Sequence, residues 1–350
     1  MNGRADIALV SLDTTMGLRS ADEALAAQVE AAGASCELVR VRIGISGRLR
    51  RTMALTDLVE ARAARRAARG VDARAVVYST VTAALLQPLR APYAVRFDGI
   101  AATNRPGIGG AWQRRREQRV LAGAALLLPW SEAARAAASV AAGSAAPAVV
   151  LPPPVLSADR PQAGAPDAVA YAANPDKRGL DLLCEAWAAA APPGARLGIS
   201  GLDRAEGVRW LRKLGTAEPA GVEWLPSMDP AAWRSLVSGA RVFVNASRIE
   251  DWGIAQMEAL ASGTPLVTLP TPGPNPALAL ARELAPELVA GERTTNALAG
   301  ALRAGLALDG PTRERYAARA AGMLEPYREE SLRRTVAEDV LPRLLASSSP

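Results

Sequence analysis

Short runs of apolar residues alternate with longer amphipathic stretches along most of this chain. The runs are rich in Val, Leu, Ile and Ala, as buried parallel strands are, and the stretches between them have the apolar spacing of helices. Parallel strands need a crossover of roughly a dozen or more residues, usually a helix. The alternation therefore predicts an α/β fold, with doubly wound sheets that helices cover on both faces.

The first part of the chain is expected to form one such sheet. Strands are expected at residues 6–12, 37–43, 75–78, 93–97 and 124–128. Helices are expected at residues 20–32, 56–69 and 112–122, and a further helix is expected to begin after Ser131 as its N-cap. Gly17 lies in the loop that would join the first strand to the first helix.

Three consecutive prolines at residues 152–154 mark the expected domain boundary, because proline lacks an N–H donor and this run joins neither a helix nor a central strand. The alternation restarts beyond them. Strands are expected at 169–172, 196–200, 221–225, 241–245 and 265–269, and helices at 179–190, 205–214, 230–238 and 254–261. A helical region at 312–345, interrupted by Pro326, follows. We therefore expect domains over 1–155 and 165–325, with a separate helical segment over 326–350.

Composition excludes several kinds of chemistry. The chain has no histidine, which rules out a Ser-His-Asp triad, a Cys-His pair and an HExxH zinc site. Neither a Walker A loop nor an Asp-x-Asp motif is present, and no metal is expected. Cys36 and Cys184 lie far apart in apolar stretches, so both are expected to be buried and reduced. Without a signal-peptide pattern or a bilayer-length apolar run, the expected location is cytoplasmic.

Basic charge is concentrated in the first 150 residues, which hold 20 arginines, no lysine and 12 acidic residues. Two explanations stay open: solvated helix faces, and contact with an anionic membrane surface or a polyanionic acceptor. Few aromatic residues lie among these arginines, so nucleic acid is not an expected partner. The clusters are Arg48, Arg50 and Arg51; Arg62, Arg65, Arg66 and Arg69; and Arg114, Arg115, Arg116 and Arg119.

The segment 244–258 holds the candidate site. Glu250 follows the expected strand at 241–245, beyond the carboxyl end where ligands bind in open α/β sheets. The N–H groups of Trp252, Gly253 and Ile254 would begin the next helix and form an anion site. Glu258 lies about one turn into that helix and leans back toward the same end. Two glutamates so spaced also occur by chance, but carboxylates beside a phosphate cradle suit a sugar nucleotide.

The run that contains Glu250-Asp-Trp-Gly-Ile-Ala-Gln-Met-Glu258, from residue 244 to 267, resembles the signature of the retaining glycosyltransferases of the GT-B type, group 1 or family 4. Residues 174–183 resemble that family's basic step before Gly-Leu-Asp, residues 197–202 its strand followed by glycine, and residues 222–226 the strand that ends at the nucleotide base. The resemblance implies two Rossmann-like domains facing across a cleft, the last helical segment returning to the first domain.

The resemblance also implies a role for each matching residue of the donor site. Lys177 or Arg178 would neutralise the donor diphosphate, although a solvated helix start is the alternative. The amides of residues 252–254 would bind the distal phosphate or the sugar. Glu258 would hold the ribose hydroxyls, and Glu250 would face the sugar near the reacting carbon. Gly201 and Leu225, at the ends of two strands, complete the expected donor-binding set.

Two further positions belong to the first domain. Many members of the family have a His-Asp pair, of which this chain keeps the aspartate, Asp98, while Phe97 takes the place of the histidine. Asp98 is expected to be catalytic. Of the family's double-glycine loop this chain keeps Gly17, which is expected on the acceptor or phosphate side. These departures leave donor-sugar recognition open.

The implied reaction transfers a sugar from a nucleotide-diphosphate donor to an unknown acceptor, a glycan, lipid or small molecule, with retention of configuration. The leaving phosphate would accept the acceptor's proton, and no cofactor or histidine is needed. A catalytically silent nucleotide-sugar-binding scaffold is one alternative. A same-fold epimerase or phosphorylase is another, although Lys177 and Lys213 are the chain's two lysines and a pyridoxal-dependent phosphorylase needs a dedicated lysine.

Overall fold

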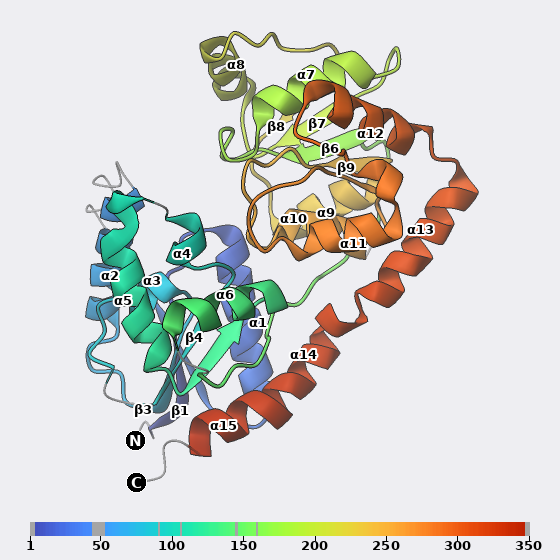
Figure 1. The fold of residues 1–350 in the computed structure, drawn as a ribbon. Coiled ribbons are helices and arrows are strands. Elements are labelled where there is room, and N and C mark those ends of the chain that lie inside the picture. The colour runs from blue at the N-terminus through green and yellow to red at the C-terminus, as the bar shows by residue number, and fades with distance from the viewer. Residues whose placement is uncertain are drawn as a thin grey trace. The chain divides into compact units, whose positions relative to one another are not determined.

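The chain forms two compact units, as a computed structural model shows. The structure describes residues 4–43, 53–89, 92–105, 107–143, 146–158 and 160–346. The first unit combines Met1–Pro154 with Tyr327–Pro350, and the second is Val155–Pro326. Each unit has a central sheet with helices on both faces (Figure 1). The chain passes from the first unit to the second directly after its three consecutive prolines.

The sheet of the first unit is parallel, with the strand order β2-β1-β3-β4-β5. The order changes direction between β1 and β3, which lie side by side. The strands are β1 (Ala5–Ser11), β2 (Cys36–Arg40), β3 (Ala73–Tyr78), β4 (Tyr93–Phe97) and β5 (Leu126–Pro129).

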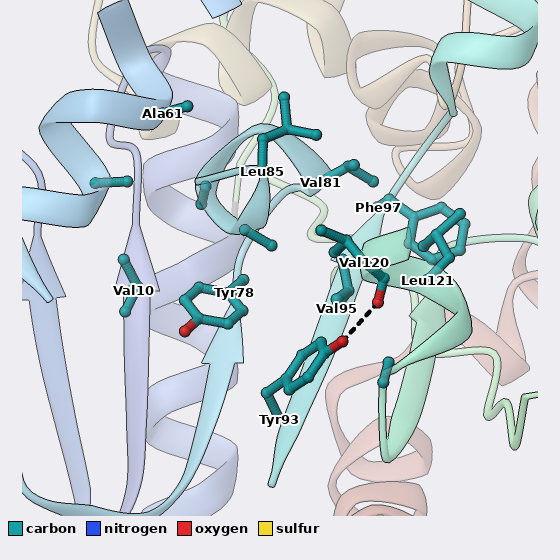
Figure 2. Packing of buried hydrophobic residues seen from close by; sticks show 14 of the residues in the cluster. Val10, Ala61, Tyr78, Val81, Leu85, Tyr93, Val95, Phe97, Val120 and Leu121 are labelled. Atoms are coloured by element: carbon teal, nitrogen blue, oxygen red, sulfur yellow. Dashed lines mark hydrogen bonds between the residues drawn. The ribbon is translucent and has the colours of Figure 1, made fainter. Parts of the chain in front are cut away.

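Helices cover this sheet on both faces. On one face Val10, Tyr78, Val95 and Leu121 belong to a single apolar cluster, where the Tyr93 hydroxyl donates to the Val120 carbonyl at 2.8 Å (Figure 2). The helices are α1 (Met16–Ala31), α2 (Met53–Ala67), α3 (Val81–Ala84), α4 (Ala101–Asn104), α5 (Ala111–Ala122) and α6 (Glu132–Ala142).

The end of the chain contributes to the opposite face. Leu332, Val336 and Leu344 are buried in one cluster with Ile7 and Leu9 of β1. They come from α14 (Glu329–Thr335), the π-helical turn Val336–Val340 and α15 (Leu341–Ala346). The final helical segment therefore belongs to the core of the first unit.

The first helix begins earlier than the sequence indicates. The Thr15 hydroxyl accepts a hydrogen bond from the Leu18 N–H and so caps α1, which starts at Met16. Gly17 therefore lies in the first turn of a helix, and its assignment to a loop is wrong. Asp13, with a positive φ of 52°, makes the turn that precedes the cap.

The sheet of the second unit is also parallel, with the order β10-β9-β6-β7-β8. Its order changes direction between β6 and β9. The strands are β6 (Ala168–Tyr171), β7 (Leu197–Ser200), β8 (Val222–Leu225), β9 (Val242–Val244) and β10 (Leu266–Val267).

Two helices of this unit have no counterpart in the sequence-based expectation, α11 (Pro276–Leu284) and α12 (Thr295–Ala307). α12 packs against α7 and buries several Ala and Leu side chains. Pro326 lies in a 3₁₀ turn, Glu325–Tyr327, and interrupts the helical region there as expected. The other helices are α7 (Leu180–Ala190), α8 (Arg204–Lys213), α9 (Pro230–Gly239), α10 (Ile254–Ala261) and α13 (Gly310–Met323).

The arginine clusters lie mainly on exposed helix faces. Arg62, Arg65, Arg66 and Arg69 are exposed along α2 and just beyond it, as are Arg115 and Arg119 on α5. The remaining cluster, Arg48, Arg50 and Arg51, lies outside the described residues. Within the described part of the chain, no helix combines the length and the apolar character that a bilayer crossing requires.

Candidate functional site

The candidate site lies where the strand order of the second sheet changes direction. β6 and β9 are neighbours there, and the chain leaves their carboxyl ends in opposite directions across the sheet. Such a point opens a crevice in which α/β proteins bind ligands. The loop after β6 carries Lys177 and Arg178, and the loop after β9 carries Glu250.

Two glycines shape the loop after β9. Gly273 has φ of 109°, and a Cβ there would lie 2.2 Å from the Glu250 carbonyl oxygen. Gly253 has φ of 77° and is the N-cap of α10, without a capping side chain. The Glu250 N–H donates to the Pro272 carbonyl at 3.0 Å. Only glycine allows the two loop segments to approach this closely.

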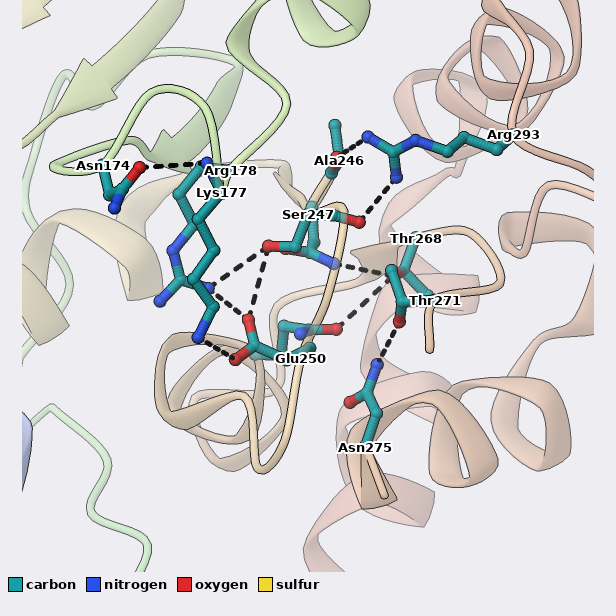
Figure 3. A network of polar contacts seen from close by, with 12 residues as sticks. Asn174, Lys177, Arg178, Ala246, Ser247, Glu250, Thr268, Thr271, Asn275 and Arg293 are labelled. Atoms are coloured by element: carbon teal, nitrogen blue, oxygen red, sulfur yellow. Dashed lines mark hydrogen bonds and ion pairs between the residues drawn. The ribbon is translucent and has the colours of Figure 1, made fainter. Parts of the chain in front are cut away.

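Glu250 is buried and surrounded by donors. Its carboxylate pairs with the Arg178 guanidinium, and the Lys177 Nζ lies 4.0 Å from Oε1 (Figure 3). The Ser247 Oγ lies 3.3 Å from Oε2. The Arg178 guanidinium also lies 5.5 Å from the centre of the Tyr171 ring, a cation–π contact. The two cations expected at a diphosphate and the carboxylate expected at a sugar are thus brought together.

A chain of buried hydrogen bonds supports this loop from beneath. The Ser247 hydroxyl donates to Asn245 Oδ1 at 2.7 Å, and Asn245 Nδ2 donates to Thr268 Oγ1 at 3.2 Å. The Thr268 hydroxyl in turn lies 3.4 Å from Gln256 Oε1. Because each donor has an assigned acceptor, the chain fixes the direction of the Asn245 and Gln256 amides.

Arg293, which the sequence analysis missed, holds the same loop by its backbone. Its guanidinium donates to the Ser247 carbonyl at 2.6 Å and to the Ala246 carbonyl at 2.7 Å (Figure 3). Burial is the main cause that lowers the pKa of this arginine. Gly179 allows the approach, because a Cβ there would lie 2.2 Å from the Ala246 carbonyl oxygen. No sequence motif marks Arg293, which is separated from its partners by more than 40 residues.

Glu258 lies on α10 and is hydrogen-bonded to an aromatic side chain. The Trp233 indole donates to Oε2 at 2.9 Å, and Arg234 Nη1 lies 3.7 Å from Oε1. Burial nevertheless raises the pKa of Glu258 to about 7. The Trp233 ring meets the Tyr171 ring edge-on at 5.6 Å. Tyr171 and Trp233 therefore connect Arg178, and through it Glu250, with Glu258.

The remaining predicted donor residues border this region. Trp252 is buried and Ile254 is the first residue of α10. Gly201, at the end of β7, has φ of 96°, and a Cβ there would lie 2.8 Å from the Ala173 amide nitrogen. The Gly201 N–H donates to the Leu225 carbonyl at the end of β8. Gly201 and Leu225 thus lie on the β7–β8 side of the sheet edge.

Asp98 and Gly17 belong to the first unit. Asp98 follows β4, and its Oδ1 accepts a hydrogen bond from the Gly99 N–H at 2.9 Å. Its charge also raises the pKa of the buried Arg96, although burial lowers that pKa more. Gly17 is part of α1, as described above.

Comparison with known proteins relates the second unit to a described family. Residues 166–307 match the family described as glycosyl transferases group 1. Over 103 residues the chain is 33% identical to the glycogen synthase of Thermus thermophilus. That stretch is 29% of this chain and 24% of the glycogen synthase, so about a quarter of that relative is matched.

Similarity to solved structures covers nearly the whole chain. Sucrose-phosphate synthase from Thermosynechococcus elongatus has a TM-score of 0.74 at 18% identity, over 99% of this chain and 100% of that one. WaaG, a glycosyltransferase involved in lipopolysaccharide biosynthesis, has a TM-score of 0.70 at 16% identity, over 95% and 99%. Anabaena HepE in complex with UDP-glucose has a TM-score of 0.69 at 14% identity, over 95% and 98%. At these identities the similarity shows a common fold, with two parallel α/β sheets.

Proposed function

We propose that this chain, which has the GT-B fold and whose residues 166–307 match the group 1 glycosyl transferases, transfers a sugar from a nucleotide-diphosphate donor to an acceptor with retention of configuration. One observation carries the proposal. Lys177, Arg178 and Glu250 converge at the point where the strand order of the second sheet changes direction. Cations for a diphosphate and a carboxylate for a sugar therefore lie within one site.

The ion pair between Arg178 and Glu250 suits a ligand that has an anionic diphosphate at one end and sugar hydroxyls at the other. A diphosphate carries more negative charge than one carboxylate and offers an arginine paired oxygens. We expect the diphosphate to replace Glu250 as the partner of Arg178 and Lys177. The Glu250 carboxylate then accepts hydrogen bonds from sugar hydroxyls. The backbone N–H groups at the start of α10, with the positive end of the helix dipole, would also bind the phosphate or the sugar.

Glu258 is the proposed ligand of the ribose. Its pKa of about 7 lets the carboxyl group accept hydrogen bonds from hydroxyls in one protonation state and donate one in the other. Trp233 and Arg234 hold it in place. Gly201 and Leu225 are the proposed boundary of the base. HepE, a structural neighbour, was solved with UDP-glucose, which makes UDP-glucose the first donor to test.

In the proposed reaction an acceptor oxygen forms a bond to the anomeric carbon as the bond from that carbon to the diphosphate oxygen breaks. The acceptor's proton passes to the leaving phosphate oxygen, so no protein base is required. Negative charge grows on the diphosphate as the bond breaks, and Lys177, Arg178 and the α10 amides would stabilise it. Removing one fixed donor of this kind typically lowers the rate by about 10²–10³.

The first unit is the proposed acceptor side, with Asp98 as a catalytic residue and the turn around Gly17 near the acceptor or the phosphate. Contact with an anionic membrane is a further part of the proposal. Ile108, which is 96% exposed, and the exposed Trp112 lie within six residues before Arg114, the first arginine of α5. Apolar side chains next to basic ones favour anionic lipid. Failure of the protein to sediment with anionic liposomes at low salt would exclude this contact.

A donor screen tests the main proposal. A sugar nucleotide that binds the folded protein should raise its unfolding temperature with ligand concentration, and donor turnover should follow with a suitable acceptor. Glu250→Gln should abolish transfer while the protein still binds the nucleotide. Glu283→Gln, an exposed change on α11, is the control and should leave both unchanged. Binding without hydrolysis or transfer would instead support the silent scaffold.

A further inference from the structure

Two buried amide side chains, Gln256 in α10 and Asn275 at the N-cap of α11, each have one atom without a hydrogen-bond partner. Gln256 is 1% exposed and Asn275 is 4% exposed. Gln256 Oε1 is engaged by the Thr268 hydroxyl, and its Nε2 has no partner. Asn275 Nδ2 donates to Thr271 Oγ1 at 2.9 Å, and its Oδ1 has no partner. An unsatisfied donor and an unsatisfied acceptor therefore remain, each at a cost to stability.

Both atoms face the same place, next to Gly253. A Cβ on Gly253 would lie 2.7 Å from Gln256 Nε2 and 3.4 Å from Asn275 Oδ1. Gly253 is the N-cap of α10, and a side chain there would meet both amides. The two atoms therefore lie within 3.4 Å of one position beside Gly253, and they do not bond to each other.

We propose that Gln256 and Asn275 bind one hydroxyl of a neutral donor sugar and so select the sugar. Gln256 Nε2 donates to the hydroxyl oxygen, and the hydroxyl donates to Asn275 Oδ1. A hydroxyl is the sugar substituent that carries both a donor and an acceptor on one atom. A carboxylate, as in a uronic acid, has no proton for Oδ1 and adds negative charge to the loop that carries Glu250. The inference rests on the proposed function, since it concerns the same donor.

Gln256→Met tests the inference because methionine keeps the length of the side chain and removes its amide. The matched control is Gln28→Met in α1, since Gln28 is also buried with an unpartnered Nε2 but lies in the first unit. Dissociation constants are measured by calorimetry on the full chain for UDP, GDP and ADP, for their glucose derivatives, and for monodeoxy forms of the glucose derivative that binds best.

We expect Gln256→Met to change the affinity for the free nucleoside diphosphate less than twofold and to weaken the sugar nucleotide about tenfold. The wild-type protein should bind one monodeoxy form about tenfold more weakly than the parent, and Gln256→Met should lose that discrimination. Gln28→Met should change neither affinity.

Two results would overturn the inference alone. One is that Gln256→Met binds the sugar nucleotide as the wild type does, which would mean that a buried water satisfies the two amides. The other is that the wild type binds the free diphosphate as tightly as every sugar derivative. A wild type that binds no nucleotide and no sugar nucleotide would instead overturn the proposed function, and the inference with it.

Discussion

Each unit contains an arginine–carboxylate pair, and the two pairs differ in their surroundings. In the first unit Arg96 Nη1 lies 3.2 Å from Asp22 Oδ1, and both side chains are 1% exposed. In the second unit Arg178 pairs with Glu250, and the arginine is 22% exposed. The first pair joins β4 to α1, whereas the second lies where the strand order of its sheet changes direction. The first pair is thus closed off inside its unit, and the second stays partly open to solvent.

The pair in the first unit attaches a helix to the sheet. Arg96 also donates to the Ala21 carbonyl at 3.0 Å and lies 4.9 Å from the Trp130 ring centre, and the Ser11 hydroxyl donates to Asp22. Burial raises the pKa of Asp22 and lowers that of Arg96, so the loss of water opposes both charges. Each charge therefore depends on the other, and α1 is held to β1 and β4.

Removing one member of the buried pair should have the largest effect. Asp22→Ala leaves the Arg96 guanidinium buried without its carboxylate, and we expect the free energy of unfolding to fall by about 3–5 kcal/mol. Urea denaturation followed by tryptophan fluorescence measures the loss. Asp72→Ala, which removes an exposed partner of Arg4, is the control and should cost less than about 1 kcal/mol. Equal losses in the two variants would show that the burial of the pair is immaterial.

The corresponding change in the second unit should affect transfer more than folding. Arg178→Met should lower the transfer rate by about 10²–10³, because the diphosphate loses a fixed cation. The urea midpoint should fall less than in Asp22→Ala, since Lys177 and Ser247 still face the Glu250 carboxylate. Arg178→Lys should recover part of the rate. Steady-state kinetics and urea denaturation on the same preparations measure the two effects. A large loss of stability with unchanged kinetics would show that this pair is structural, like the pair in the first unit.

The pH dependence of stability should sharpen the comparison, because each unit buries one glutamate with a pKa of about 7. In the first unit burial raises the pKa of Glu117, which accepts a hydrogen bond from the Ala101 N–H; in the second, burial raises that of Glu258. The folded state therefore holds a proton that the unfolded chain releases near pH 4.5.

The stability from each proton is present below pH 4.5 and is lost as the pH rises toward 7, by up to about 3 kcal/mol for each group. We expect the urea midpoint to fall between pH 5 and pH 7.5, a window taken roughly from these pKa values. Glu117→Gln and Glu258→Gln should each flatten the fall. Only Glu258→Gln should also weaken nucleotide binding. A midpoint that rises over this range would contradict both assignments.

The smallest expected effect concerns the aromatic bridge of the second unit. Tyr171→Leu removes the ring over which the Arg178 guanidinium lies, a contact worth about 0.5–1 kcal/mol at a partly exposed site. Diphosphate affinity should therefore fall about two- to fivefold. Tyr171→Phe keeps the ring and should bind as the wild type does. Calorimetry distinguishes them, and an equal loss in both variants would assign the effect to the hydroxyl.

Much of the fold could be predicted because the strands are apolar runs between helices. The expectations failed where a local or distant contact decides the structure. Thr15 caps α1 early and takes Gly17 into the helix. α12 is rich in alanine and glycine, and its position depends on packing against α7.

The residues of the candidate site likewise fall into those that the sequence predicts and those that only the structure reveals. Glu250, Glu258, Lys177 and Arg178 stand in short motifs that the sequence displays, and the structure brings three of them into contact. Arg293 and the Trp233–Glu258 bond belong to no motif, because they join residues more than 20 positions apart. Gln256 and Asn275 stand out only once burial leaves their amide atoms without partners.

The return of residues 329–346 to the first core has a consequence for synthesis on the ribosome. The face of the first sheet that carries Ile7 and Leu9 is completed by Leu332, Val336 and Leu344. These leucines and valine are translated after the whole second unit. The second unit can therefore fold first, while the nascent first unit keeps an apolar face uncovered and in need of protection until the end of the chain emerges.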